Sequence, residues 1–193
     1  MTDKRAELFK CAKELFSANG FKETNVADIT KTAGMAVGTF YNYYPSKEKL
    51  FLDIFLEENL KLKNYIMDSV DLNGEPLQLI HDVIRLNFDG MSSNPILREW
   101  YNRDVFGKIE QLFRTENGLD SVGFLYGSFF ELVQKWQTEG KMRKDLDPEL
   151  IMAIFSAIIN IDMHKDEIGL KYFPQVVDYI SEFIIKGLTD KPK

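Results

Sequence analysis

Apolar residues recur every three to four positions along almost the whole chain, and no useful stretch alternates with the two-residue period of a β-strand. The first segment shows the pattern, since Leu8, Cys11, Ala12, Leu15 and Phe16 share one face of a helix. The sequence therefore predicts an all-α protein, with about nine helices by this periodicity.

Capping and turn residues set the expected limits of these helices. Asn19-Gly20 and Gly34 supply helix stops, Asn25 and Ser46 can cap helix starts, and Asp147-Pro148 is typical of a helix N-terminus. We expect helices over residues 3–18, 25–34, 37–44, 47 into the sixties, 76–91, 96–115, 119–139, 147–164 and 173–186.

Composition bounds the class of protein. The chain has 193 residues, of which 45% are hydrophobic and 28% charged, so disordered and fibrous classes are excluded. The lone cysteine, Cys11, cannot form an internal disulfide, and the charged N-terminus does not resemble a signal peptide. No apolar run approaches the roughly 20 residues that a membrane span needs. We expect a cytoplasmic protein that has no membrane partner.

Charge is distributed unevenly along the chain. Residues 1–50 hold eight basic and six acidic residues, a net charge of +2, whereas residues 51–193 hold sixteen and twenty-four, a net charge of -8. Between Ile29 and Lys47 there are two lysines and no acidic residue. A DNA-contacting surface is therefore expected in this segment, where a polyanion meets no local repulsion.

Residues 25–49 have the spacing of a helix-turn-helix. Gly34 lies between two short helical segments and can adopt the left-handed conformation that folds the second across the first. Phe40 and Tyr44 are expected to pack inward. The residues left outside are Val37, Gly38, Thr39, Tyr41, Asn42 and Tyr43. Their hydroxyl, amide and phenol groups can donate hydrogen bonds, and Gly38 lets the backbone come close to DNA.

Residues 4–52 resemble TetR-type transcriptional repressors. The resemblance is carried by Leu8, Ala12, Leu15, Phe16, Gly20 and Phe21, by Thr24 and Ala33-Gly34-Met35, by Gly38-Thr39-Phe40-Tyr41-Asn42-Tyr43-Tyr44, and by Ser46-Lys47-Glu48-Lys49-Leu50. The chain departs from the usual pattern at Asn25, Thr30 and Ala36. The missing hydroxyl at Ala36 removes one expected cap or phosphate contact.

The resemblance implies roles in binding double-stranded operator DNA. Gly38 and Thr39 would lie at the DNA, and Tyr41 and Lys47 would hold phosphates. Val37, Asn42 and Tyr43 would discriminate operator bases, and Asn25 is counted with these contacts. Packing is the alternative role for Tyr41 and Tyr43. Lys47 at a helix start is unfavourable with the helix dipole, so a nearby phosphate is its expected partner.

The resemblance also implies an effector cavity among the middle helices, where aromatic residues gather. Apolar residues of this kind are more often core than pocket, so a plain core is the alternative. His81, Arg85, Asn87, Asn160 and Asp162 are polar residues that could orient a ligand. The candidate ligand-binding residues are Phe88, Met91, Trp100, Phe106, Phe113, Tyr126, Phe129, Phe130 and Ile158.

The last two predicted helices carry more apolar surface than peripheral helices need. The resemblance assigns them to a four-helix homodimer interface, and a monomeric core is the alternative. The candidate interface residues are Ile151, Phe155, Ile158, Val176, Ile180, Phe183 and Ile184.

These features predict a DNA-binding domain over residues 1–46 and an effector-binding and dimerisation domain over residues 47–193. We expect a repressor that a small, largely apolar or aromatic effector releases from its operator. A regulator of the same fold, controlled by a protein partner and without a small ligand, is the alternative. The sequence contains no metal-ligand cluster, nucleophile motif or phosphate loop, so we expect no enzyme activity and no cofactor or metal.

Overall fold

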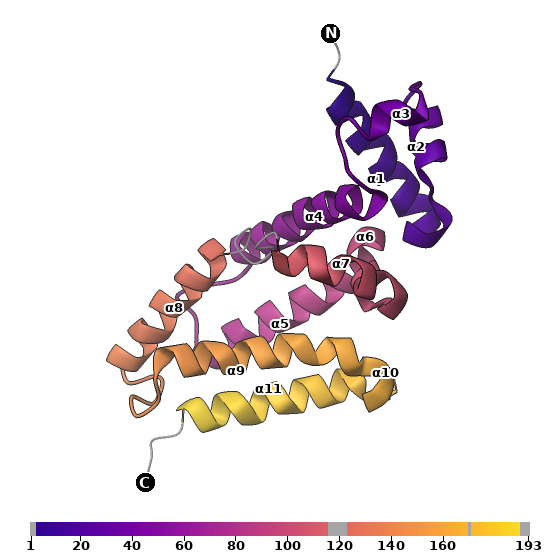
Figure 1. The fold of residues 1–193 in the computed structure, drawn as a ribbon. Helices are drawn as coiled ribbons and strands as arrows, with labels where there is room; N and C mark the ends of the chain where they lie inside the picture. Colours follow the sequence, from indigo (N-terminus) through magenta and orange to yellow (C-terminus); the bar gives the residue numbers. More distant parts are fainter. Residues whose placement is uncertain (1–2, 116–122, 170, 190–193) are drawn as a thin grey trace. The chain divides into compact units, whose positions relative to one another are not determined.

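A computed structural model describes residues 3–115, 123–169 and 171–189, and the regular structure in these ranges is helical, as predicted (Figure 1). Two compact units are present. The first unit comprises Met1–Leu62 and Asp89–Ser121, and the second comprises Lys63–Phe88 and Val122–Lys193. Packing thus divides the chain within a helix at residue 62, whereas the functional division at residue 46 stays a prediction.

The first unit contains the N-terminal helices and a short helical segment from the middle of the chain. Its elements are α1 (Lys4–Glu23), α2 (Val26–Thr32), α3 (Val37–Phe40), the first part of α4 (Lys47–Ser69), the end of α5 (Pro76–Ser93), α6 (Pro95–Arg98), η1 (Glu99–Tyr101) and α7 (Arg103–Thr115). Phe16, Phe21 and Phe51 are fully buried at its centre, with their rings 4.9–5.9 Å apart. This aromatic cluster fixes α1 against α4.

The second unit contains the rest of α4, most of α5 and the C-terminal helices. These are α8 (Gly123–Thr138), α9 (Pro148–Asn160), η3 (Ile161–His164), α10 (Lys165–Ile168) and α11 (Phe173–Thr189). Trp136, Val133, Ile151 and Ile185 are among the buried residues of its core. No helix within the described ranges is both long and apolar enough to cross a membrane.

The predicted helix limits are mostly confirmed, with four differences. The helix expected over residues 37–44 is α3, which ends at Phe40, and residues 41–43 form a turn. α1 extends to Glu23 because the chain resumes a helical turn after Gly20, which has a φ of 81°. The segment 96–115 forms α6, η1 and α7, since Asn102 adopts an extended conformation between them. The helix expected to end at His164 ends at Asn160. Residues 119–122, at the predicted start of α8, lie outside the described residues.

Candidate nucleic-acid interface

The turn between α2 and α3 is closed by hydrogen bonds and a left-handed glycine. Asn25 Oδ1 accepts from the Asp28 amide at 2.9 Å, which caps α2 as predicted. Gly34 has a φ of 66°, a conformation that favours glycine. The Met35 amide then donates to the Thr30 carbonyl at 2.8 Å. The helix-turn-helix geometry therefore follows from residues of α2 and the turn themselves.

The predicted DNA-contacting residues of this segment lie on α3 and in the turn that follows it, over residues 37–43. Phe40 and Tyr44 are buried and anchor this segment. Val37, Tyr41 and Tyr43 are 47%, 58% and 38% exposed, which is unusual for large apolar or aromatic side chains. Within the chain, this exposure disfavours the packing role for both tyrosines. Gly38 and Asn42 are also exposed, and Thr39 is partly buried.

Gly38 is not required by the packing of the chain. No heavy atom outside its immediate neighbours lies within 4 Å of the position that a Cβ would occupy. Gly38 also lies outside the positive-φ region. A side chain at this position would meet only whatever approaches α3 from outside, and the close approach of DNA stays a prediction.

Lys47 has partners within the chain, which differs from the prediction that a phosphate accounts for it. Its Nζ donates to the carbonyls of Phe21 at 2.9 Å and Thr24 at 2.8 Å, and it lies 4.1 Å from the centre of the Phe21 ring. Burial lowers the pKa of Lys47. These carbonyls follow the kink at Gly20, so the cation neutralises the carboxyl end of α1.

Phe21 is also held from its amide side. The amide of Phe21 donates to Glu99 Oε1 at 3.0 Å, and Asn102 Nδ2 donates to Glu99 Oε2 at 3.3 Å. The carboxylate of Glu99 lies 2.8 Å from where a Cβ on Gly20 would be. Gly20 therefore gives Glu99 access to the end of α1. Sequence analysis missed this contact because 78 residues separate Glu99 from Phe21.

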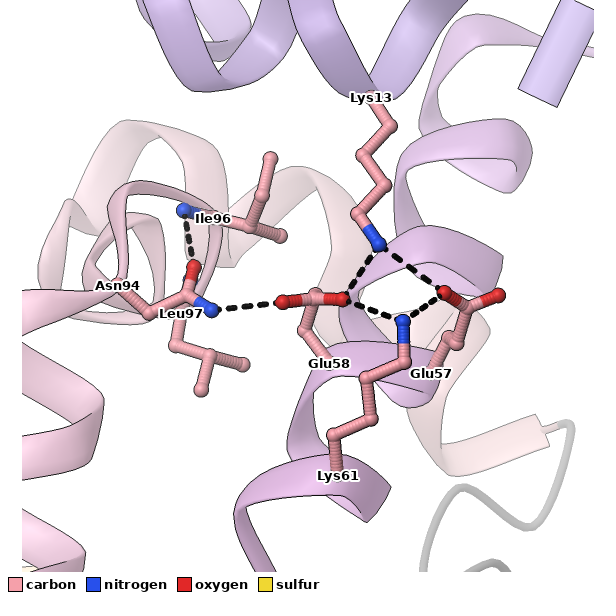
Figure 2. Close-up of polar contacts among 7 residues, drawn as sticks. All are labelled: Lys13, Glu57, Glu58, Lys61, Asn94, Ile96 and Leu97. Carbon is pink, nitrogen blue, oxygen red and sulfur yellow. Dashed lines mark hydrogen bonds and ion pairs between the residues drawn. The ribbon is translucent and has the colours of Figure 1, made fainter. Parts of the chain in front are cut away.

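A partly buried carboxylate connects α1, α4 and α6 within the first unit (Figure 2). Glu58 accepts from Lys13 Nζ at 2.6 Å, Lys61 Nζ at 3.0 Å and Asn94 Nδ2 at 2.8 Å. Lys13 also donates to Glu57 at 3.1 Å. Burial would raise the pKa of Glu58, but hydrogen bonds from both lysines and from Asn94 lower it to about 2. The helical spacing of Glu57, Glu58 and Lys61 is visible in the sequence, whereas the contacts from Lys13 and Asn94 are not.

The same network fixes the start of α6. Asn94 Oδ1 accepts from the amides of Ile96 at 2.9 Å and Leu97 at 3.3 Å, while its Nδ2 donates to Glu58 (Figure 2). One side chain thus caps α6 and joins it to α4. Because Ile96 and Leu97 are buried, this cap holds α6 in place within the first unit.

Few basic side chains near α3 remain for an external anion. Lys49 forms an ion pair with Asp53 at 2.6 Å, and Lys22 pairs with Asp104. Lys47 is used by the carbonyls described above. Lys31, in the last turn of α2, is exposed and forms no ion pair with the described residues. Lys31 is therefore the cation of this segment best placed for a phosphate.

The predicted ligand-binding residues fall into both units. Trp100 contacts Phe106 at 4.6 Å and Phe113 at 5.1 Å between ring centres, and it stacks on Phe55 at 5.0 Å. This aromatic group and the buried Met91 belong to the first unit. The other candidates belong to the second unit, where Ile158 is buried, Phe88, Phe129 and Phe130 are partly buried against the core, and Tyr126 is half exposed.

The polar residues that were predicted to orient a ligand differ in their burial. Asn87 is buried, His81 is partly buried, and Arg85 and Asn160 are exposed. The side chain of Asp162 lies outside the described residues.

Two predicted interface residues are buried in the core of the second unit. Ile151 and Ile158 are 0% and 2% exposed, so they pack within the chain itself. Phe183 is 65% exposed and stacks on Tyr179, with ring centres 5.9 Å apart. The remaining candidates are partly buried: Phe155, Val176, Ile180 and Ile184.

Comparisons with known proteins agree with this geometry. A family model described as bacterial regulatory proteins of the tetR family matches residues 8–54, from α1 into α4. YdgC from Bacillus subtilis, named an uncharacterized HTH-type transcriptional regulator, is 33% identical over 189 residues, which cover 97% of this chain and 85% of YdgC. The HTH-type transcriptional repressor KstR2 from Mycobacterium tuberculosis is 24% identical over 160 residues, which cover 78% of this chain and 75% of KstR2.

A solved structure extends the similarity over the fold. The crystal structure of RolR in complex with resorcinol has a TM-score of 0.61 at 15% identity, and the match covers 96% of this chain and 87% of RolR. At this identity the likeness concerns the fold alone.

Proposed function

The chain belongs to the tetR family of bacterial regulatory proteins and is a DNA-binding transcriptional regulator, and from this premise we propose that it is a repressor. In this proposal a homodimer binds a near-palindromic operator. A small, largely apolar or aromatic effector then releases it. The relative KstR2 is named a repressor, which supports repression, and RolR was crystallised with resorcinol, which supports a small aromatic effector.

The observation that carries the proposal is the exposure of side chains on α3 and in the turn that follows it. In the proposal, Val37, Asn42 and Tyr43 read base edges, and Tyr41 donates its hydroxyl to a phosphate. Gly38 and Thr39 would lie where the backbone meets the DNA. We assign the second phosphate contact to Lys31 instead of Lys47, because Lys47 already neutralises the end of α1.

The dimer is proposed to form through the exposed sides of α9 and α11. Tyr179 and Phe183 leave a stacked aromatic pair on α11, and Leu150 is 50% exposed on α9. Ala153 and Ala157 are exposed on the same side of α9 as Leu150, by their helical spacing, and would let a second helix come close. A four-helix interface built from these sides would bury all five residues.

Effector release requires coupling between the effector and α1–α3. Trp100, in the aromatic group of the first unit, directly follows Glu99, which binds the Phe21 amide at the end of α1. A shift of Trp100 on effector binding would therefore also move Glu99. Couplings of roughly 1–3 kcal/mol are typical of allosteric pairs, and one charge-assisted hydrogen bond contributes about 1.5–3 kcal/mol.

Selection from random-sequence duplex DNA, followed by footprinting, tests the proposal. We expect a near-palindrome with half-sites about one helical turn apart, bound by a dimer. Asn42→Ala and Tyr43→Ala should change which operator bases determine the binding affinity, whereas Lys31→Ala should lower the affinity for all DNA sequences equally. A single asymmetric half-site bound by a monomer would contradict the proposal.

A further inference from the structure

A lysine on α4 has only a neutral partner in the second unit. Lys63 donates from Nζ to Oδ1 of Asn87 on α5. Asn87 is 4% exposed, while Lys63 keeps part of its surface accessible. Among the described residues, no carboxylate forms an ion pair with Lys63, and burial alone lowers the pKa of Lys63 to about 8. The ammonium is therefore still mostly protonated at neutral pH.

Lys47 on α4 likewise has only neutral partners, two backbone carbonyls, whereas three other lysines that touch α4 have carboxylate partners. Lys13 and Lys61 share the carboxylate of Glu58, and Lys49 pairs with Asp53. A partly buried ammonium without a counter-ion is unfavourable, because one amide oxygen does not replace its lost hydration. An anion that arrives from outside would remove this penalty.

The pair also presents hydrogen-bond donors without acceptors. An ammonium has three N–H groups, and Lys63 uses one on Asn87. Asn87 gives its Oδ1 to Lys63, and no acceptor for its Nδ2, which is bonded to the same amide carbon, occurs among the residues that the structure describes. Two donor groups next to one another suit a carboxylate, whose two oxygens accept from both.

The surroundings of this pair on α5 are apolar. Ile84, one turn before Asn87, is 5% exposed and belongs to the core of the second unit. Phe88 follows Asn87 and packs edge-on against Phe173, with ring centres 5.9 Å apart. A ligand whose charged end reaches Lys63 would place its remaining atoms near hydrocarbon. Charge-assisted hydrogen bonds are also stronger in such surroundings.

We propose that Lys63 and Asn87 form a receptor for the carboxylate of an amphipathic ligand with an apolar body. The carboxylate accepts from Lys63 Nζ and Asn87 Nδ2, and the body lies along the apolar side of α5. The inference rests on the proposed function only in identifying this ligand as the effector. It narrows the effector from any apolar or aromatic compound to an organic acid.

The chain provides a matched control for this site. Lys135 Nζ donates to Asn73 Oδ1 at 3.3 Å, so it forms the same type of lysine–asparagine pair. Lys135 is exposed, however, and lies at the surface of α8. Lys135→Met removes one positive charge from the second unit without touching the proposed receptor.

Calorimetry on the full chain without DNA tests the inference. The probes are hexanoate, octanoate, decanoate and 3-phenylpropanoate, each compared with the matching primary alcohol, and acetate serves as a carboxylate without a body. At neutral pH we expect at least one acid to bind about tenfold tighter than its alcohol, the effect of one charge-assisted hydrogen bond. Lys63→Met should abolish this preference but keep alcohol binding, and Lys63→Arg and Lys135→Met should keep the preference.

Several results would overturn the inference. These are equal binding of acid and alcohol by the wild type, an unchanged preference in Lys63→Met, equal binding of acetate and the longer acids, or no binding of any acid. Thermal melts of each variant separate lost binding from lost folding, and Lys63→Arg reports on charge if Lys63→Met unfolds. Operator binding is measured separately, so failure of the repressor proposal leaves a distinct result: acid binding without DNA binding.

Discussion

Replacing Gly38 with alanine separates the stability of the fold from DNA binding. The position of a Cβ on Gly38 meets no atom of the chain within 4 Å, and Gly38 adopts no positive φ. Alanine is favoured over glycine in a helix interior by about 0.8–1 kcal/mol. In the short α3 we expect about half of that gain, which would raise the melting temperature by roughly 1–2 °C in a chain of this size.

The same methyl group should weaken operator binding. If DNA approaches the backbone at Gly38, the added carbon occupies space that the DNA needs. We expect a loss of affinity of about tenfold or more, equivalent to about 1.4 kcal/mol. Calorimetric melting and fluorescence anisotropy with a selected operator, at one fixed salt concentration, give the two quantities for the same preparation.

Gly107→Ala is the matched control for this experiment. Gly107 lies in α7, it is exposed, and a Cβ there also meets nothing within 4 Å. This variant should gain stability in the same way and bind the operator as the wild type does. Unchanged operator affinity in Gly38→Ala would refute the close approach of DNA to α3. A loss of stability in Gly38→Ala would show that the surroundings of α3 differ from those described.

Three other predictions test the contacts of Lys47 and Lys31, the carboxylate of Glu58 and the proposed dimer. Lys47→Met should lower the free energy of unfolding in urea by about 1–3 kcal/mol, because the carbonyls of Phe21 and Thr24 lose a charged hydrogen-bond donor. Lys31→Ala should leave stability unchanged but reduce the salt dependence of operator binding by about one unit of slope, and the reverse pattern would contradict both assignments. The pKa of Glu58 is lowered from 4.5 to about 2, so its contribution is fully present above pH 4.5 and is lost as the pH falls towards 2. Glu58→Gln should therefore lower the free energy of unfolding at neutral pH by about 1–2 kcal/mol after allowance for solvent screening. In urea unfolding this difference from the wild type should shrink as the pH falls, and a difference that stays the same at low pH would contradict the prediction. Phe183→Asp should produce monomers in sedimentation experiments, while the exposed control Leu72→Asp should not, and a dimeric Phe183→Asp would place the interface elsewhere.

Local signals in the sequence were sufficient for most of the helix-turn-helix. Asn25 caps α2, Gly34 takes the left-handed conformation, and Phe40 is buried as its spacing predicted. Each of these outcomes depends on residues within a few positions of one another. Helix capping and periodicity are therefore enough to predict them.

Contacts between distant segments account for what could not be predicted. Lys47 was interpreted from its place in the helix dipole alone, whereas its partners, Phe21 and Thr24, are 26 and 23 residues away. The burial of Ile151 and Ile158 within the chain was missed for a related reason. α9 is apolar on more than one side, and periodicity does not tell which side faces the core of the second unit.

The end of α1 is the point where these distant contacts meet. Phe21 donates its amide to Glu99 and accepts at its carbonyl from Lys47, so one residue is held by an anion and a cation from two other helical segments. Because Phe21 is also buried against Phe16 and Phe51, it cannot follow one partner without disturbing α1 and α4. A displacement of Glu99 must either break its hydrogen bond or move the end of α1. The first alternative costs about 1.5–3 kcal/mol, which is as large as a typical allosteric coupling.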